Sequence, residues 1–214
     1  VQQLQGYETV TDATSFSFQL GGHTFIALIF PTAMRAWLYD VGEQLFSKWL
    51  FWNTLTSTWE AVRVRTHVLT PDGTHLVGDR ASGAFYDMRA DVYTDVDDSL
   101  ILRERTPPRL SAEGQVRFTV PLIQLIMDVG VGVLGTSTTD PSVNPAAMLR
   151  TSRDGGRTFG AERTASIGRL GEYQTRVQWT QCGQARNRVD RFQFAAACPI
   201  RIADALVEMT VGTS

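Results

Sequence analysis

The residues best able to do chemistry in this chain lie together in the stretch Ser152–Phe159, which reads SRDGGRTF. Such a stretch suits a catalytic loop, a phosphate-binding loop, or a loop that fastens a β-hairpin. A phosphate-binding loop ends in Gly-Lys-Ser or Gly-Lys-Thr and opens a helix. This stretch contains no lysine, and the residues that follow it are strand-like. A phosphate-binding role is therefore disfavoured.

A fastening role accounts for each residue type in the loop. The aspartate can accept hydrogen bonds from backbone N–H groups of its own tight turn. The two glycines supply positive φ, the two hydroxyls can satisfy remaining donors or acceptors, and the phenyl ring can insert beneath the loop into the sheet. We therefore predict a structural set made of Ser152, Asp154, Gly156, Thr158 and Phe159.

The other reactive residue types do not form a catalytic or metal-binding set. The histidines are isolated, without the spacing to another histidine, cysteine or carboxylate that a metal site needs; they are His23, His67 and His75. The acidic run Asp91–Ser99 lacks the ligand alternation and central glycine of an EF-hand loop, which favours a solvated turn over a calcium site. We expect no catalytic residue, no metal site and no cofactor.

Four aromatic residues are concentrated in one short segment: Trp49, Phe51, Trp52 and Trp59. Exposed aromatic rings can stack on bases or sugars. Packing between strands is the more common use of such residues, and we favour it here.

The composition is that of an ordinary globular protein, with 43% hydrophobic and 20% charged residues among 214 and a net charge of −2. No apolar run approaches the roughly 20 residues of a membrane helix. Cys182 and Cys198 are too few for a disulfide framework, so we expect two buried free thiols. The chain begins with Val1, and we expect it to be part of a longer chain or a processed product.

The charges are segregated along the chain. Residues 1–149 carry 10 basic and 16 acidic side chains, whereas residues 150–201 carry 10 arginines and 4 acids. A basic face of this kind could meet phosphate or an acidic partner surface. Pairing of the arginines with the acidic first part is the simpler interpretation.

Strand-like stretches separated by turns position these residues, so the chain is predicted to be all-β. Gly21-Gly22 suits a two-residue hairpin turn, and Pro71-Asp72-Gly73 suits a tight turn because proline presets φ and glycine accepts positive φ. Pro121 predicts an edge or a bulge in the apolar stretch 116–129. We also expect late strands at residues 172–179, 189–196 and 200–211.

A weak internal repeat suggests propeller-type blades. The stretches AWLYD and GAFYD place Tyr39 and Tyr86 47 residues apart, which is about the length of one four-stranded blade. We predict blades at residues 1–135, a polar loop at 136–147, and a C-terminal β-module at 148–214 that contains the SRDGGRTF hairpin. A propeller needs at least four blades, so this would be an incomplete, C-terminal part of one.

SRDGGRTF resembles the Asp-box of propeller proteins, sialidases among them. The wider sequence resembles the packaged-DNA stabilisation proteins of short-tailed bacteriophages (podoviruses), the tail hub or nozzle family. The resemblance covers most of residues 7–210 and is carried by GGHTFIALIFPTAMRAWLYD, HLVGDRASGAFYDMRADVYTD, LIMDVGVG, and the long stretch from LRTSRDGGRTF through SIGRLGEY to RVDRFQF.

This resemblance implies a structural protein without an active site. Six copies would form a ring on the tail axis that continues the DNA channel below the portal and its adaptor, helps retain packaged DNA, binds a needle or plug, and supports tailspikes or fibres. DNA would pass without sequence-specific binding. The protein would lie in the virion tail, and in the host cytoplasm during assembly.

The alternative is a carbohydrate-binding or sialidase-like propeller module. A sialidase would need several Asp-boxes, an arginine cluster and a Tyr/Glu nucleophile pair. Glu172 and Tyr173 are adjacent, but neighbours on a strand point to opposite faces.

We also expect most arginines between Arg150 and Arg201 to contact protein and few to face the DNA channel, because each neutralised phosphate adds affinity and would impede ejection.

Overall fold

The computed structural model describes residues 4–53, 55–137 and 139–212, which form strands, turns and three short 3₁₀ helices. The helices are η1 (Leu4–Gly6), η2 (Val96–Asp98) and η3 (Glu113–Gln115). The prediction of an all-β chain is confirmed. No helix in the described ranges has the length and apolar character needed to cross a membrane. The chain divides into two compact units, Val1–Val92 and Tyr93–Ser214.

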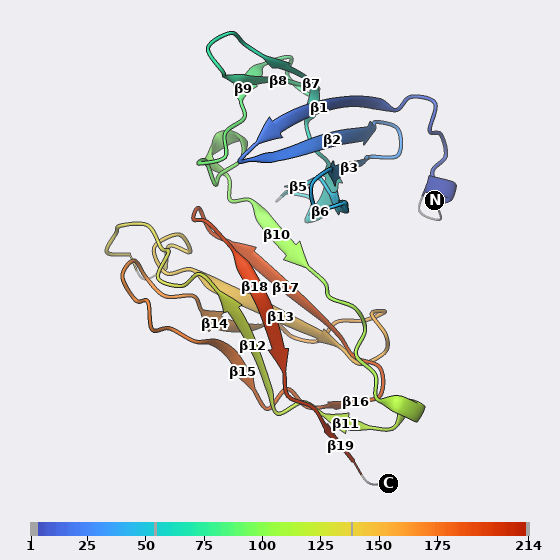
Figure 1. Cartoon of the computed structure of the whole chain (residues 1–214), viewed down its shortest axis with the longest axis vertical. Helices are drawn as coiled ribbons and strands as arrows, with labels where there is room; N and C mark the ends of the chain where they lie inside the picture. The colour runs from blue at the N-terminus through green and yellow to red at the C-terminus, as the bar shows by residue number, and fades with distance from the viewer. Residues whose placement is uncertain (1–3, 54, 138, 213–214) are drawn as a thin grey trace. The chain divides into compact units, whose positions relative to one another are not determined.

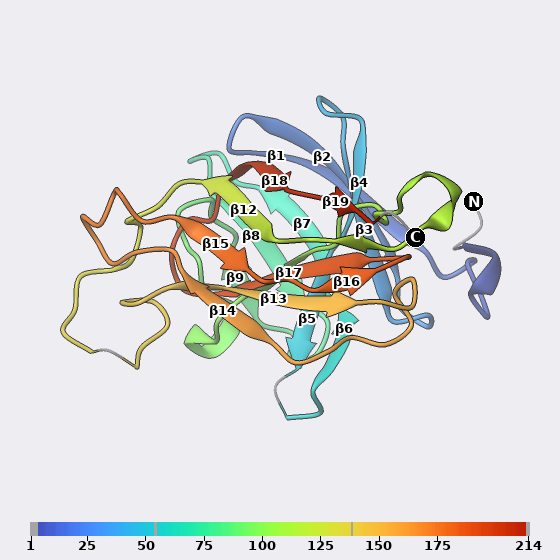
Figure 2. The same ribbon diagram turned by 90° about the horizontal axis from the view of Figure 1, so that it is seen from below.

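The first unit contains three antiparallel sheets, labelled in Figures 1 and 2. The largest has its strands in chain order: β1 (Thr14–Leu20), β2 (His23–Phe30), β3 (Arg35–Asp40) and β4 (Leu45–Lys48). A hairpin follows, made of β5 (Leu50–Asn53) and β6 (Thr58–Ala61). The third sheet consists of β7 (Val64–Leu69), β8 (His75–Asp79) and β9 (Phe85–Asp87).

The two predicted turns of the first unit are confirmed. Leu20 pairs with His23 across the two-residue turn, where Gly21 and Gly22 have φ of 60° and 87°. The second turn, at residues 70–74, closes the β7–β8 hairpin, and Gly73 has φ of 87°. Positive φ at these positions carries little steric cost only for glycine.

Three further hairpins of the first unit close with the same side-chain device. An Asx residue ends the first strand, and its side chain accepts hydrogen bonds from the backbone N–H groups two and three residues later. Asp40 binds the nitrogens of residues 42 and 43, Asn53 those of 55 and 56, and Asp79 those of 81 and 82. These acceptors replace the strand partners that the turning backbone loses.

The residue four positions after each Asx residue has a left-handed backbone. Its φ is 55° at Gln44, 53° at Ser57 and 70° at Gly83. Each hairpin then continues with an aromatic residue six positions after the Asx residue: Phe46, Trp59 and Phe85. The shared geometry means that one type of loop is used three times in this unit.

Aromatic packing holds the first unit together. Phe16 and Phe18 of β1 lie 5.6 and 5.7 Å, centroid to centroid, from the ring of His67 on β7. Phe18 is only 6% exposed and also lies 5.9 Å from Trp49. Full burial of one such ring contributes about 1.5–3 kcal/mol.

The second unit is a two-layered β-structure. One sheet has the order β10 (Leu102–Arg105), β17 (Val189–Ala195), β13 (Ala146–Ser152), β14 (Arg163–Ser166). The other has the order β15 (Val177–Thr180), β12 (Leu122–Met127), β18 (Ile202–Val207), and Figure 2 shows it lying over the first. A short third sheet has the order β16 (Gln184–Ala185), β11 (Phe118–Thr119), β19 (Thr210–Val211).

The core of the second unit lies between these two layers. Alternate residues of β12, β13, β15 and β17 are buried, as expected of strands with one face inward. Trp179 of β15 lies 5.7 Å from Phe192 of the facing sheet, centroid to centroid. The indole N–H of Trp179 donates to the Arg163 carbonyl at 3.1 Å, so the polar atom of this buried ring is satisfied.

The structure differs from the predicted modules in one respect. The strands of residues 102–127 share sheets with strands of residues 146–211, because β12 pairs with both β15 and β18.

The break predicted at Pro121 is present, between β11 and β12, but β12 is a central strand. The late strands are shorter than predicted; β15 begins only at Val177 because residues 168–175 form turns with Gly168 and Gly171 at φ of 94° and 90°.

Candidate functional site

The SRDGGRTF stretch forms the loop between β13 and β14, and Asp154 is its hydrogen-bonding centre. Asp154 Oδ1 accepts from the Ser152 hydroxyl at 2.6 Å and from the backbone nitrogens of Arg157 and Thr158 at 2.9 Å each. Its Oδ2 accepts from the Thr158 hydroxyl at 2.6 Å. The Ser152 oxygen in turn accepts from the nitrogen of Gly156 at 2.8 Å.

These bonds determine what the loop can do chemically. The hydroxyls of Ser152 and Thr158, followed by backbone N–H groups of the loop, hold the pKa of Asp154 well below its usual range. Gly155 and Gly156 have φ of 78° and 98°. A carboxylate so stabilised in its ionised form is poorly suited to exchange protons near neutral pH. The geometry suits a structural role, in which Asp154 stabilises the loop between β13 and β14, better than it suits catalysis.

Phe159 lies half-buried at the end of the loop. The guanidinium of Arg191, on β17, lies 3.9 Å from the Phe159 ring centroid, a cation–π contact. Arg191 also pairs with Glu104 of β10, with 3.3 Å between Nε and Oε1. The ring therefore connects the loop to the sheet that carries it.

A buried ion pair lies beneath the loop. The Arg188 side chain is fully buried, and its guanidinium donates to both carboxylate oxygens of Asp190 at 2.7 and 2.8 Å. It also donates to the Cys182 carbonyl at 2.6 Å and to the Thr151 hydroxyl at 2.9 Å. The sequence analysis counted Arg188 with the other arginines of the basic segment, and nothing in its sequence context marked it as buried.

Most of the other arginines of this segment are exposed. Among residues 150–201 the exposed ones are Arg153, Arg157, Arg163, Arg176, Arg186 and Arg201. Within the described ranges, only Arg201 of these six lies within 4.0 Å of a carboxylate, that of Asp128. Arg163 instead donates to the Thr180 carbonyl at 2.6 Å. Among these six exposed arginines, the expected pairing with an acid of residues 1–149 is therefore found, in the described part of the chain, only at Arg201.

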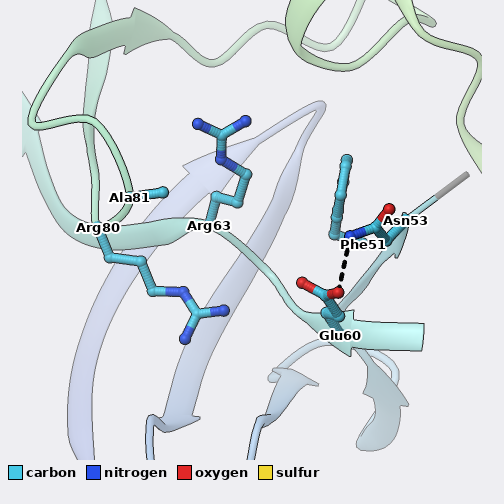
Figure 3. A pocket seen from close by; sticks show the side chains of 6 residues that line it. All are labelled: Phe51, Asn53, Glu60, Arg63, Arg80 and Ala81. Atoms are coloured by element: carbon cyan, nitrogen blue, oxygen red, sulfur yellow. Dashed lines mark hydrogen bonds between the residues drawn. The ribbon is translucent and has the colours of Figure 1, made fainter. Parts of the chain in front are cut away.

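A cavity of about 530 Å³ lies in the first unit, shown in Figure 3. Three of its residues come from one face of the β5–β6 hairpin: Phe51, Asn53 and Glu60. The others follow β6 and β8: Arg63, Arg80 and Ala81. The sequence analysis singled out only Phe51 of these six, within the aromatic segment.

The remaining aromatic residues of that segment pack within the unit, as favoured from the sequence. Trp52 and Trp59 form an edge-to-face pair with centroids 5.0 Å apart, and Trp49 packs against Phe16 and Phe18. Phe51 is the one that borders the cavity.

The histidines are less isolated than predicted. His67 Nε2 lies 3.0 Å from His75 Nδ1 across the β7–β8 hairpin, and His23 Nδ1 lies 2.7 Å from Asp40 Oδ2. Both members of the first pair flank the Pro71-Asp72-Gly73 turn. The predicted turn was therefore the feature of the sequence that could have revealed their contact. Burial, followed by the neighbouring His75, lowers the pKa of His67.

The acidic run and the cysteines are accounted for by local structure. Asp95 caps η2 by accepting from the Val96 nitrogen at 2.8 Å, and Asp91 pairs with Arg89. No cluster of three or more potential metal ligands occurs among the described residues. Cys182 and Cys198 are buried free thiols, as predicted, and burial raises the pKa of Cys198.

Glu172 and Tyr173 lie in an exposed turn before β15, not on a strand as expected. The Glu172 carboxylate accepts from the Arg169 nitrogen at 2.8 Å, so it stabilises its own turn. The Tyr173 side chain is 70% exposed. These two residues are not gathered with other candidate catalytic groups.

Comparison with known families identifies the second unit. The family model described as bacteriophage P22 Gp10, β-sandwich, matches residues 104–210. The chain belongs to this family.

The P22 Gp10 β-sandwich family is a tail hub or nozzle family of short-tailed bacteriophages, as the sequence resemblance implied. Its matched range runs from β10 to β19 and includes the Asp154 loop and the Arg188–Asp190 pair. The two facing sheets agree with the sandwich description. A search of curated proteins found no match. Membership makes the chain a structural component of a phage tail, and hence of the virion.

Proposed function

We propose that the chain is a subunit of a tail hub ring that continues the DNA channel below the portal and its adaptor. In this role it helps retain packaged DNA and supports a needle or plug and the tailspikes or fibres. The observation that carries the proposal is the family match over residues 104–210, which spans nearly all strands of the sandwich. DNA in transit would meet the ring without sequence-specific binding.

Ring formation would use the segregated charges. The exposed arginines of the sandwich lack carboxylate partners within the described ranges, except for Arg201. A heterologous contact between one subunit and the next closes into a ring when the rotation fits. We propose a hexameric ring in which the acidic first part of one subunit faces these arginines on its neighbour.

Propeller-type blades are proposed for the first unit. The β1–β4 sheet has the up-and-down order of a blade. Tyr39 lies on β3 and Tyr86 on β9, and each of these is the third strand of its sheet. This equivalence supports the repeat noted in the sequence.

The SRDGGRTF loop is proposed to be an Asp-box with a structural role, and the protein to have no enzymatic activity. The hydrogen bonds centred on Asp154 support a fastening of the β13–β14 hairpin. Glu172 and Tyr173, the pair considered for a sialidase-like activity, lie in an exposed turn where the Glu172 carboxylate is used locally.

Particles assembled without this chain test the function. They should package DNA and then lose it, and they should lack distal tail structures; supplying the chain in trans should restore both. Stable retention of DNA by particles shown to lack the chain would contradict the proposal.

Electron microscopy of the assembled tail tests the role of the arginines. We expect a ring in which few of the ten arginines between Arg150 and Arg201 face the channel. If most of them lined the channel, the basic segment would be a DNA-binding surface and its proposed role in subunit contacts would be wrong.

A further inference from the structure

The cavity of the first unit has two walls of opposite character (Figure 3). Arg63 and Arg80 form one wall, and the polar face of the β5–β6 hairpin, with Asn53 and Glu60, forms the other. Phe51 adds an apolar surface beside the polar pair. Of the six lining residues, all but Ala81 are half-buried, so the cavity is accessible while its side chains are held in place.

Arg80 is the cation available to a ligand. The side chain of its neighbour Asp79 is only 1% exposed and is already engaged by Arg63, by the nitrogens of residues 81 and 82 and by the Ser82 hydroxyl. The Arg80 guanidinium contacts the Ala61 carbonyl at 3.3 Å and the Met34 sulfur at 3.5 Å. No carboxylate among the described residues pairs with it. A carboxylate from outside could therefore form a charge-assisted hydrogen bond with Arg80.

The opposite wall offers an acceptor. Asn53 donates to Glu60 Oε1 at 2.8 Å, while its own oxygen accepts from the nitrogens of residues 55 and 56. This arrangement fixes the amide orientation and leaves Glu60 Oε2 without a hydrogen-bond partner in the part of the chain that the structure describes. An N–H donor on a ligand could reach this oxygen.

These features select the chemistry of the ligand. A carboxylate for Arg80, an N–H donor for Glu60 and an apolar group for Phe51 occur together in a peptide with an acidic residue beside an apolar one. A nucleic-acid backbone fits poorly, because the side chains of Arg63, Arg80, Glu60 and Asp79 sum to no net charge, whereas phosphate tracks need a basic stripe.

We propose that this cavity binds a peptide segment of another protein through an acidic side chain held by Arg80. The family match, which carries the proposed hub function, does not account for this site. The site lies in the first unit, outside the residues matched by the family model. Its partner is identified by chemistry: a segment with an Asp or Glu next to a hydrophobic residue.

The test uses the whole chain and two capped peptides, acetyl-Ala-Asp-Phe-Ala-amide and its analogue with Asn in place of Asp. Binding is followed by NMR through the Arg80 side-chain N–H and the Ala81 amide. The Asp peptide should give saturable shifts, and the Asn analogue should bind about tenfold more weakly, because it lacks the charge. Arg80→Gln should weaken the Asp peptide similarly.

Arg65→Gln is the matched control, since Arg65 is an exposed arginine of β7 that does not line the cavity; it should leave binding unchanged. The spectrum of each variant shows whether it is folded. No saturable shift up to about 10 mM peptide, equal binding of the two peptides, or displacement of the Asp peptide by an equal concentration of inorganic phosphate or oligonucleotide would each overturn the proposal.

Discussion

Asp154 shows how one exposed carboxylate can organise a loop. Four groups donate to it, two hydroxyls and two backbone nitrogens, all from residues within four positions along the chain. Because the donors are local, the loop can form as soon as its hairpin does. Both carboxylate oxygens are used, and a neutral amide has one oxygen fewer with which to accept these bonds.

Replacing Asp154 should therefore destabilise the fold. Asp154→Ala and Asp154→Asn should lower the midpoint of thermal unfolding, with alanine the more severe change because it removes the acceptor of all four groups that donate to Asp154. Glu162→Gln is the control, because Glu162 is another exposed acid between β13 and β14 and forms no hydrogen bond or ion pair with the described residues. An unchanged midpoint in Asp154→Ala would show that the loop does not need its aspartate.

The same residue gives a pH dependence of known sign. Its pKa is lower in the folded than in the unfolded protein, so its stabilisation is present above the unfolded pKa of about 4 and is lost as pH falls towards the folded pKa. The free energy of unfolding of the parent protein should therefore fall more steeply below about pH 4 than that of Asp154→Asn. Denaturant titrations of both proteins at several pH values measure this free energy. If it changed equally with pH in the parent protein and in Asp154→Asn, the prediction would be wrong.

Loss of Arg188 should strongly destabilise the second unit. Arg188→Met leaves the buried Asp190 carboxylate without its ion-pair partner, and breaking one side of such a pair costs about 3–5 kcal/mol. Arg186→Met changes an exposed arginine two positions earlier and should have little effect. Urea unfolding of both variants measures the difference, and equal stabilities would show that Asp190 is compensated by other groups.

At the scale of elements, the first unit repeats one hairpin loop with different residues at its left-handed position. A side chain with a Cβ is strained there by roughly 1–2 kcal/mol, and glycine is not. Two of the three loops carry that strain, at Gln44 and Ser57, while the third has Gly83.

Glycine should therefore stabilise the first two loops. Gln44→Gly and Ser57→Gly should each raise the free energy of unfolding by up to about 1 kcal/mol, after the entropy cost of glycine is subtracted. Gly83→Ala should lower it by a similar amount. Thermal unfolding of the three single variants tests this, and stabilisation by Gly83→Ala would contradict the assigned geometry.

Local signals in the sequence were enough to predict the hairpins. Gly21-Gly22, the turn at Gly73 and the break at Pro121 each express a backbone preference of the residue itself. The pairing of β12 with β15 and β18 could not be predicted in this way, because those strands lie about 50 and 80 residues further along the chain. The cavity and the burial of Arg188 likewise depend on packing between segments that the local signals do not connect, whereas the His67–His75 contact lies across one predicted hairpin turn.

At the scale of the whole molecule, the exposed arginines of the sandwich lack carboxylate partners among the described residues, except for Arg201. Arg153 and Arg186 belong to adjacent segments, because Asp154 and Asn187 form a β-bridge. In a ring, both would be available to an acidic surface of the next subunit. Contacts of this kind depend on ionic strength.

Charge reversal at these positions should weaken assembly. Arg153→Glu combined with Arg186→Glu should shift the protein from rings towards monomers, whereas Arg65→Glu in the first unit should not. Sedimentation at low and high salt measures the shift, which should shrink as salt rises. Intact rings in the double variant at low salt would exclude these arginines from the subunit contact.

The distribution of tryptophan has a practical consequence. Four of the five tryptophans belong to the first unit, and Trp179, which is 2% exposed, is the single one in the second. Its indole is enclosed by the sandwich core and should emit at short wavelength in the folded protein. A chain with the other four indoles changed to phenylalanine would thus carry one optical reporter, able to follow melting of the sandwich by fluorescence separately from the rest of the protein.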